Sequence, residues 1–231
     1  MSLNPLSAVR KFIAKKRELR DFRDLSIQEV FTRIYLSNKW GGSESVSGKG
    51  SSLQRTAGLT LAVPDLFKRF GARSVLDIPC GDFHWMQKVD LKGIEYIGAD
   101  IVMPLIEANN RQFGSAHHKF LQLDLTTDDL PKVDVVFCRE CLVHLSFENI
   151  FLALRNIRRS ESTFLFATHF PALERNQDIV TGKHRRLNFR LAPFHWPEPE
   201  YVYEEYDAGK GRGVKSIAVW KIATLPDPVN H

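Results

Sequence analysis

Nine consecutive residues decide the fold of this chain: Val75-Leu76-Asp77-Ile78-Pro79-Cys80-Gly81-Asp82-Phe83. The apolar run from Ser74 to Ile78 predicts a short buried strand. A proline, a glycine and an acid follow at once, and they predict a tight turn and a short helix after the strand. Ligands of open α/β sheets bind beyond the carboxyl ends of the strands, so this turn is the first candidate for a binding site.

Strands and helices alternate after this turn. Helices are predicted over 103–113 and 146–158, between strands at 96–100, 119–123, 133–138 and 163–168. This alternation predicts right-handed crossovers and a parallel sheet. The last two predicted strands, 201–206 and 216–222, are joined by a glycine-rich turn over 209–213, which indicates an antiparallel hairpin at the edge of the sheet.

The net positive charge of the chain comes from residues 1–39. The net charge is +5, and residues 1–39 hold nine Lys or Arg against four Asp or Glu, whereas residues 40–231 hold 23 of each. The neutral main part is not a basic platform for nucleic acid, and we expect no DNA partner. The segment 5–25 predicts a basic amphipathic helix. We leave open whether it packs on the domain or contacts a membrane surface or an anionic partner.

A second helix is predicted over 26–37, because Ser26 and Glu29 have the spacing of a capping box. No apolar run approaches the roughly 20 residues of a membrane-spanning helix, which excludes an integral membrane protein. The N-terminus lacks an apolar signal region, and an odd, low cysteine count does not indicate a disulfide framework. We therefore expect a cytoplasmic protein. Cys138 and Cys141 have no companion ligands at zinc spacing, so no metal is expected.

Acidic residues end the first three predicted strands: Asp77, Asp100 and Asp124. Asp100 follows Gly81 by 19 residues, a spacing that suits a carboxylate binding two ribose hydroxyls. The first turn lacks G-x-G-x-x-G and carries the extra acid Asp82, so a pyrophosphate would be repelled. A nucleoside with a cationic centre fits better, and S-adenosylmethionine matches that description.

The stretch 75–83 resembles the first motif of class I S-adenosylmethionine-dependent methyltransferases, and 138–145 resembles their fourth motif. The variant turn, with Trp40-Gly41-Gly42 and 47–52 upstream, resembles a bacterial subgroup whose substrates are unassigned. The resemblance runs from about residue 40 to residue 222. It implies a Rossmann-like seven-stranded α/β sheet, mostly parallel with a C-terminal antiparallel hairpin. The methyltransferase domain would then span 40–231, after an N-terminal helical extension over 1–39.

The resemblance also implies which residues contact the cofactor. Asp100 would bind the ribose with Ile101 against the adenine, and Asp124 would bind the adenine amine with Leu125 beside it. Where most of the family has glycine, this chain has proline, so the local contact there differs. The residues expected at the motif turn and the methionine end are Asp77, Pro79, Cys80, Gly81, Asp82, Arg139 and Glu140.

The glycine- and serine-rich stretch 40–52 precedes a predicted helix over 53–70. By composition it is either a linker or a functional loop. In the resembled family such segments fold over the cofactor, so we expect a lid that includes Trp40, Gly48 and Ser51, with Thr56 behind it. The alternative is a tryptophan that packs structurally on the sheet.

Methyl transfer to a hydroxyl or a cationic amine needs a general base. His144 is the first candidate, His169 the second and Glu140 the third, although His144 could instead cap the helix after it. The acceptor is expected between 170 and 200, where 183–190 holds four cations and no acid. This composition suits an anionic or polyhydroxylated acceptor, and the alternative is a solvated basic loop. The substrate-binding candidates are Lys183, Arg185, Arg186, Asn188 and Trp196.

The sequence therefore predicts a methyltransferase that acts on a small molecule or a glycan, on oxygen. Two alternatives stay open. One is an RNA or protein methyltransferase, and the other is a non-catalytic module that binds the cofactor without transferring its methyl group.

Overall fold

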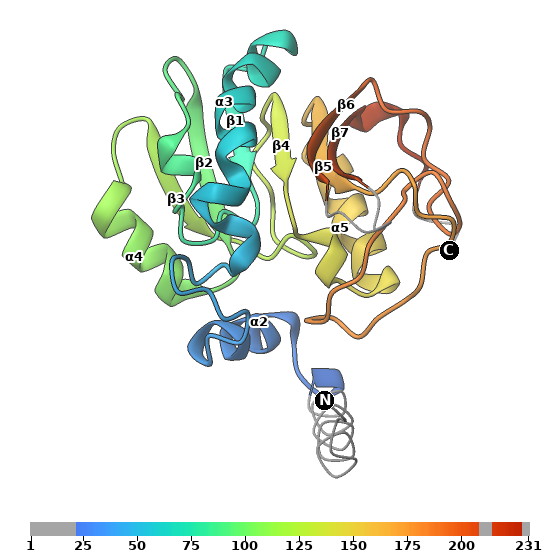
Figure 1. Ribbon diagram of the computed structural model, residues 1–231, viewed down its shortest axis with the longest axis horizontal. Helices are drawn as coiled ribbons and strands as arrows, with labels where there is room; N and C mark the ends of the chain where they lie inside the picture. The colour runs from blue at the N-terminus through green and yellow to red at the C-terminus, as the bar shows by residue number, and fades with distance from the viewer. Residues whose placement is uncertain (1–21, 208–213, 228–231) are drawn as a thin grey trace, which may run out of the picture.

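A computed structural model describes residues 22–207 and 214–227 of the chain. Its centre is one seven-stranded sheet in the order β3-β2-β1-β4-β5-β7-β6 (Figure 1). The first five strands run parallel, and β7 runs antiparallel to β5 and β6, which confirms the predicted mixed sheet. The strands are β1 Ser74–Asp77, β2 Glu95–Asp100, β3 His118–Gln122, β4 Val135–Cys138, β5 Phe164–His169, β6 Tyr201–Asp207 and β7 Val214–Lys221.

The described helices lie where the sequence predicts them, within two residues. They are α2 Ile27–Leu36, α3 Leu53–Arg69, α4 Met103–Phe113 and α5 Phe147–Arg159. After β1 the chain forms only a 3₁₀ turn, Met86–Lys88, where a short helix was predicted. The basic helix predicted for 5–25 lies almost wholly outside the described residues, and so does the turn predicted for 209–213. None of the described helices is long and apolar enough to cross a membrane.

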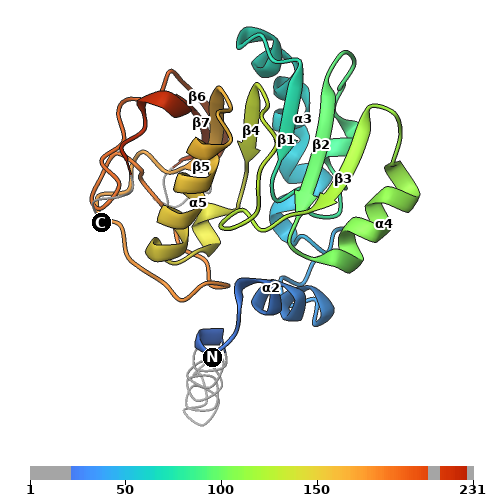
Figure 2. The ribbon, with the colours of Figure 1, turned by 180° about the vertical axis from the view of Figure 1, so that it is seen from behind.

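Alternate residues of the central strands enter two core layers, one on each face of the sheet. Val75 packs with α3 and α4 on one face, and its neighbour Leu76 packs with α5 on the other. Figures 1 and 2 show α3 and α5 on opposite faces of the sheet. Because both faces are covered, the ends of the strands are where polar groups can gather.

Helix α2 lies across one end of this sandwich, below the strands in Figure 1. It begins at the predicted capping box, in which Ser26 Oγ accepts from Glu29 N at 3.2 Å and Glu29 Oε2 accepts from Ser26 N at 2.8 Å. Its inner face buries Val30, which packs against Gly182. A Cβ atom at Gly182 would lie only 2.5 Å from Val30 Cγ1, so glycine allows the helix this close approach.

Candidate active site

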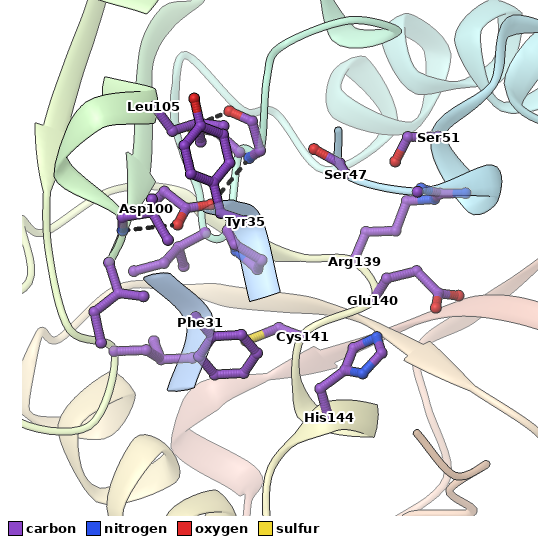
Figure 3. A pocket seen from close by; sticks show the side chains of 18 of the residues that line it. Phe31, Tyr35, Ser47, Ser51, Asp100, Leu105, Arg139, Glu140, Cys141 and His144 are labelled. Atoms are coloured by element: carbon purple, nitrogen blue, oxygen red, sulfur yellow. Dashed lines mark hydrogen bonds between the residues drawn. The ribbon is translucent and has the colours of Figure 1, made fainter. Parts of the chain in front are cut away.

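A cavity of about 450 Å³ opens at the carboxyl ends of the parallel strands. The three strand-end acids, Asp77, Asp100 and Asp124, all line it, as the sequence predicts. Helix α2 and the stretch 40–51 form its other walls (Figure 3). Such a size is typical of small-molecule sites, which span roughly 300–1,000 Å³.

The glycine- and serine-rich stretch is held against the first motif turn. The Asp82 carboxylate accepts from Ser45 Oγ at 2.9 Å and from Val46 N at 2.9 Å. Gly81 has a φ of +56°, and a Cβ atom there would lie 2.2 Å from Ser47 Oγ. The turn therefore needs glycine both for its backbone conformation and for this contact. The stretch is a wall of the cavity rather than a free linker.

Burial raises the pKa values of two of the three strand-end acids, Asp77 and Asp100. Asp77 is 3% exposed, and burial raises its pKa to about 7 although Tyr96 Oη donates to it at 2.6 Å. Burial likewise raises the pKa of Asp100 to about 6, against the N–H donors of Val102 at 3.0 Å and Gly81 at 3.3 Å. Both carboxyls gain from a cationic ligand, because a positive charge would stabilise their ionised forms.

A buried ionic network lies behind the end of β4. Arg139 donates to Gly50 O at 2.9 Å and, through Nε, to Glu205 Oε1 at 3.1 Å. Lys215 Nζ bridges Glu205 at 2.6 Å and Glu140 at 2.9 Å. Arg139 thus connects β6 to the stretch 40–51. Burial acts to raise the pKa of Glu140, but Lys215 and Arg139 outweigh it and lower that pKa to about 2.

The His144 ring has a defined tautomer. Its Nδ1 lies 2.9 Å from the Lys183 carbonyl oxygen. A carbonyl can only accept, so Nδ1 carries the proton and Nε2 keeps a lone pair. Burial lowers the pKa of His144 to about 4, which keeps the ring neutral at pH 7. His144 does not cap α5, because the N-cap is Ser146, whose Oγ accepts from Asn149 N at 3.3 Å.

Most of the expected cofactor and lid residues line the cavity. Asp82 and Thr56 do not: the first holds the stretch 40–51, and the second is buried in α3 with its hydroxyl on Ser52 O at 3.0 Å. The predicted residues that line the cavity are Trp40, Gly48, Ser51, Asp77, Pro79, Cys80, Gly81, Asp100, Ile101, Asp124, Leu125, Arg139, Glu140 and His144.

His169, the second base candidate, lies in the core. It is 1% exposed, and its Nδ1 accepts from Phe189 N at 3.3 Å. Trp196 lies there too, stacked on Phe189 with ring centroids 4.2 Å apart. Both belong to an aromatic core cluster that also contains Trp220. Neither side chain lines the cavity.

The basic segment 183–190 does not form a cationic pocket. Arg185 donates to Leu142 O at 2.7 Å and to Leu145 O at 2.6 Å, so it holds the backbone beside His144. Asn188 Nδ2 donates to two backbone carbonyls, Pro171 O at 3.0 Å and Leu173 O at 2.9 Å. Lys183 and Arg186 lie near the rings of Phe22 and Phe170 respectively, outside the lining. Of this segment, only His184 lines the cavity among the described residues.

Helix α2 supplies wall residues that were not predicted: Ile27, Phe31 and Tyr35. They are four residues apart, so they share one face of the helix. That spacing was a signal available in the sequence. Residues of the expected N-terminal extension, 1–39, therefore line the cavity together with residues of the expected methyltransferase domain, 40–231. The sequence also did not predict that Lys215 and Glu205 belong to the site. Nothing near them in the sequence indicates that they contact Arg139 and Glu140 after β4.

Comparisons with known proteins agree with this fold. Residues 76–160 match the family model of a methyltransferase domain. No curated protein matches the sequence. Magnesium protoporphyrin IX methyltransferase (ChlM) from Synechocystis PCC 6803, solved with bound SAM, is 12% identical with a TM-score of 0.58, and the match covers 85% of this chain and 97% of that chain.

Two other solved structures share the fold. The methyltransferase domain of bacterial CtHen1 is 14% identical with a TM-score of 0.54, over 74% of this chain and 100% of that one. The [4+2]-cyclase SpnF is 19% identical with a TM-score of 0.50, over 62% of this chain and 60% of that one. Together, the family model matched over residues 76–160, the motif turn with its strand-end acids, and the strand order support a likeness to the class I S-adenosylmethionine-dependent methyltransferases.

Proposed function

We propose that this protein transfers the methyl group of S-adenosylmethionine to a hydroxyl of a small-molecule acceptor, with His144 as the general base. The observation that carries the proposal is one cavity with three strand-end acids on one side and a neutral imidazole at its other end. The acids suit a cationic nucleoside, and the imidazole suits a proton acceptor.

The residues of the cavity fit the cofactor. Asp100 would accept from the ribose hydroxyls, and Asp77 would face the ammonium group. Asp124 would accept from the adenine amine, between the apolar side chains of Ile101 and Leu125. Arg139, whose Nε and Nη2 donors are engaged by Glu205 and Gly50 O, would position the covering stretch.

When bound, S-adenosylmethionine supplies a methyl carbon on a positively charged sulfur, which leaves as a neutral thioether. The protein then has to orient the acceptor and remove its proton. His144 Nε2 takes that proton, while the Lys183 carbonyl holds the ring through Nδ1. Glu140, kept ionised by Lys215, favours the protonated imidazole through its negative charge.

The proposal does not require an acceptor molecule that carries a negative charge. An anionic acceptor was expected from the cations of 183–190, but Arg185 is engaged with backbone carbonyls there. No described contact favours an RNA or a protein acceptor. The cyclase among the structural neighbours shows that this fold can host a different named activity, so the transfer itself has to be measured.

The first test is titration calorimetry with S-adenosylmethionine. We expect binding to the native protein and at least a tenfold loss of affinity in Asp100→Asn. Asp129→Asn is the matched control, because the Asp129 side chain is 98% exposed and pairs with Arg159. Absence of binding at millimolar cofactor would contradict the proposal. The second test is the transfer of labelled methyl into a cell extract fractionated by size. Label confined to RNA or protein would contradict the small-molecule acceptor.

A further inference from the structure

The two ends of the cavity differ in chemistry. The end near β1, β2 and β3 carries the three acids. The end beyond β4 is walled by four rings: Phe31, Trp40, His144 and His184. The Trp40 ring lies 6.2 Å from Phe31 and 5.0 Å from His144 between centroids, and the His144 and His184 rings are 5.3 Å apart. Figure 3 shows Phe31 and His144 at the same side of the cavity, away from Asp100.

We infer that the acceptor is a planar aromatic molecule with an acidic hydroxyl, a phenol in chemical class, and that it binds between α2 and His144. This inference rests on the proposed function, since it names the acceptor of the same site. Three properties of the ring-walled end support it: its shape, its charge and the strength of its base.

Rings from four segments form this end: α2, the stretch 40–51, the residues after β4 and the segment 183–190. Ring walls favour a flat aromatic ligand through stacking and edge contacts. A sugar would need many polar partners for its hydroxyls. The polar side chains that line the cavity beside these rings include Glu140, Ser47 and Ser51, together with the ring nitrogens of Trp40, His144 and His184 themselves. The ring faces, which are the larger part of this wall, offer a sugar no hydrogen-bond partner.

The carboxylate of Glu140 lines this end of the cavity and would repel a carboxylate or phosphate placed directly beside it, even though Lys215 compensates part of its charge. Glu140 is ionised and its side chain is 26% exposed, towards the cavity that it lines. The Lys and Arg side chains of the described lining are Arg139, bound to Glu205, and Lys49. A neutral phenol avoids repulsion by Glu140 and acquires charge only as its proton moves to His144.

His144 is a weak base, because burial lowers the pKa of its imidazole to about 4. A weak base removes a proton efficiently only from a fairly acidic group. A phenolic hydroxyl such as that of tyrosine titrates near pH ~10, whereas water titrates near ~15.7 and aliphatic hydroxyls resemble water. His144 is therefore matched to a phenol much better than to an alcohol.

The step balances within this site. A lone pair of the acceptor oxygen forms the new bond to the methyl carbon, and the electron pair of the broken carbon–sulfur bond stays on sulfur. The hydroxyl proton goes to His144 Nε2. The products are an aryl methyl ether, S-adenosylhomocysteine and an imidazolium ion that returns its proton to water.

The test compares 2-naphthol with decahydro-2-naphthol, which has the same carbon skeleton without the aromatic rings or the acidic hydroxyl. Calorimetry on the protein loaded with S-adenosylhomocysteine measures acceptor binding without turnover. We expect 2-naphthol to bind at least tenfold more tightly than its saturated analogue and than methyl glucoside. Equal affinities, or tighter binding of the glucoside, would overturn the inference.

Turnover with S-adenosylmethionine is the second measurement. We expect 2-methoxynaphthalene to form at least tenfold faster than the ether of the saturated alcohol. If the cofactor binds but the aromatic probe shows no preference in either assay, the acceptor class is wrong and the cofactor assignment stands. If the cofactor itself does not bind, the proposed function fails first.

Phe31→Leu keeps an apolar side chain and removes the ring. We expect a five- to tenfold loss of 2-naphthol affinity, with cofactor affinity within twofold of the native value. Phe70→Leu is the matched control, a half-buried ring that packs on Phe164 and Phe166 outside the cavity. Equal effects of both variants on naphthol binding would contradict a specific role for Phe31.

Discussion

Asp82 and Ser47 exchange hydrogen bonds across 35 positions of the chain. The Asp82 backbone N–H donates to Ser47 Oγ at 3.0 Å, and Ser47 Oγ donates to Asp82 Oδ1 at 3.1 Å. Glu44 extends the contact, because its Oε1 lies 3.1 Å from His84 Nε2 and accepts from Leu53 N at 3.0 Å. These hydrogen bonds hold the stretch 44–53 against the motif turn. We call them the clasp, and they fix the wall of the cavity that this stretch forms.

Asp82→Ala removes the acceptor for Ser45, Val46 and Ser47. We expect the covering stretch to loosen and the affinity for S-adenosylmethionine to fall about tenfold, which is ~1.4 kcal/mol. Calorimetry measures the affinity. Asp90→Ala is the control, since Asp90 is exposed and accepts only locally, from Lys92 N at 3.1 Å. An unchanged affinity in Asp82→Ala would show that the clasp does not shape the site.

Gly81→Ala introduces two separate faults: a left-handed backbone conformation, which costs roughly 1–2 kcal/mol for a non-glycine residue, and a clash with Ser47 Oγ at 2.2 Å. We expect cofactor binding to be lost in calorimetry. Adding Ser47→Gly removes the clash but not the backbone cost. Ser47→Gly alone already lacks the hydrogen bonds between Ser47 and Asp82, so it is the reference variant. Gly81→Ala should lower the affinity less in that background than in the native protein, and an equal loss would contradict the steric explanation.

The cofactor affinity should depend on pH through Asp77 and Asp100. Their pKa values are raised to about 7 and about 6, so both become neutral as the pH falls through that range. A neutral carboxyl does not attract the ammonium group, and affinity should drop about tenfold per pH unit below pH 7. Binding should also release protons, because a bound cation lowers the pKa of a nearby carboxyl.

Calorimetry in buffers of different ionisation enthalpy measures these protons. Asp77→Asn should flatten the pH dependence above pH 6 and leave the part that belongs to Asp100. Proton uptake on binding at pH 6.5 would contradict the assignment, because it has the opposite sign.

His144→Gln removes the base but keeps a polar side chain of similar length. General-base catalysis contributes typically about 10²–10⁴-fold to a rate, so we expect kcat to fall by at least 100-fold. The affinity for S-adenosylmethionine should change by less than threefold. Steady-state kinetics and calorimetry separate the two effects. His118→Gln is the control, because His118 packs on Tyr96 and Phe83 outside the cavity lining.

Lys215→Met leaves Glu140 and Glu205 without their shared cation. Breaking a buried ion pair from one side costs about 3–5 kcal/mol, and we expect a loss of this size in urea unfolding at pH 7. The lowered pKa of Glu140 stabilises the native fold above the pKa of the unfolded chain and is lost as the pH falls towards about 2. The variant should therefore differ least from the native protein in acid.

Lys132→Met is the matched control, since its pair with Glu161 at 3.2 Å is exposed and such pairs contribute roughly 0–1 kcal/mol. A loss in Lys215→Met as small as the one expected for Lys132→Met would show that the buried network does not stabilise the fold.

The sequence by itself determined the sheet and the acidic half of the cavity. Apolar runs such as 74–78 form strands wherever they are buried on both faces, and parallel strands share their carboxyl edge. Asp77, Asp100 and Asp124 had to meet at that edge once the strands were placed. The start of α2 was equally local, because a capping box involves only residues three apart.

Only the tertiary structure decided which side chains face the cavity at its other end. His169 and Trp196 enter the core because the segment 187–196 packs on β5 and β7, and no local pattern encodes that contact. Phe31 reaches the cavity because Gly182 admits α2, and Lys215 reaches Glu140 across the sheet. Secondary structure follows from neighbours in the chain, whereas the role of a side chain follows from neighbours in space.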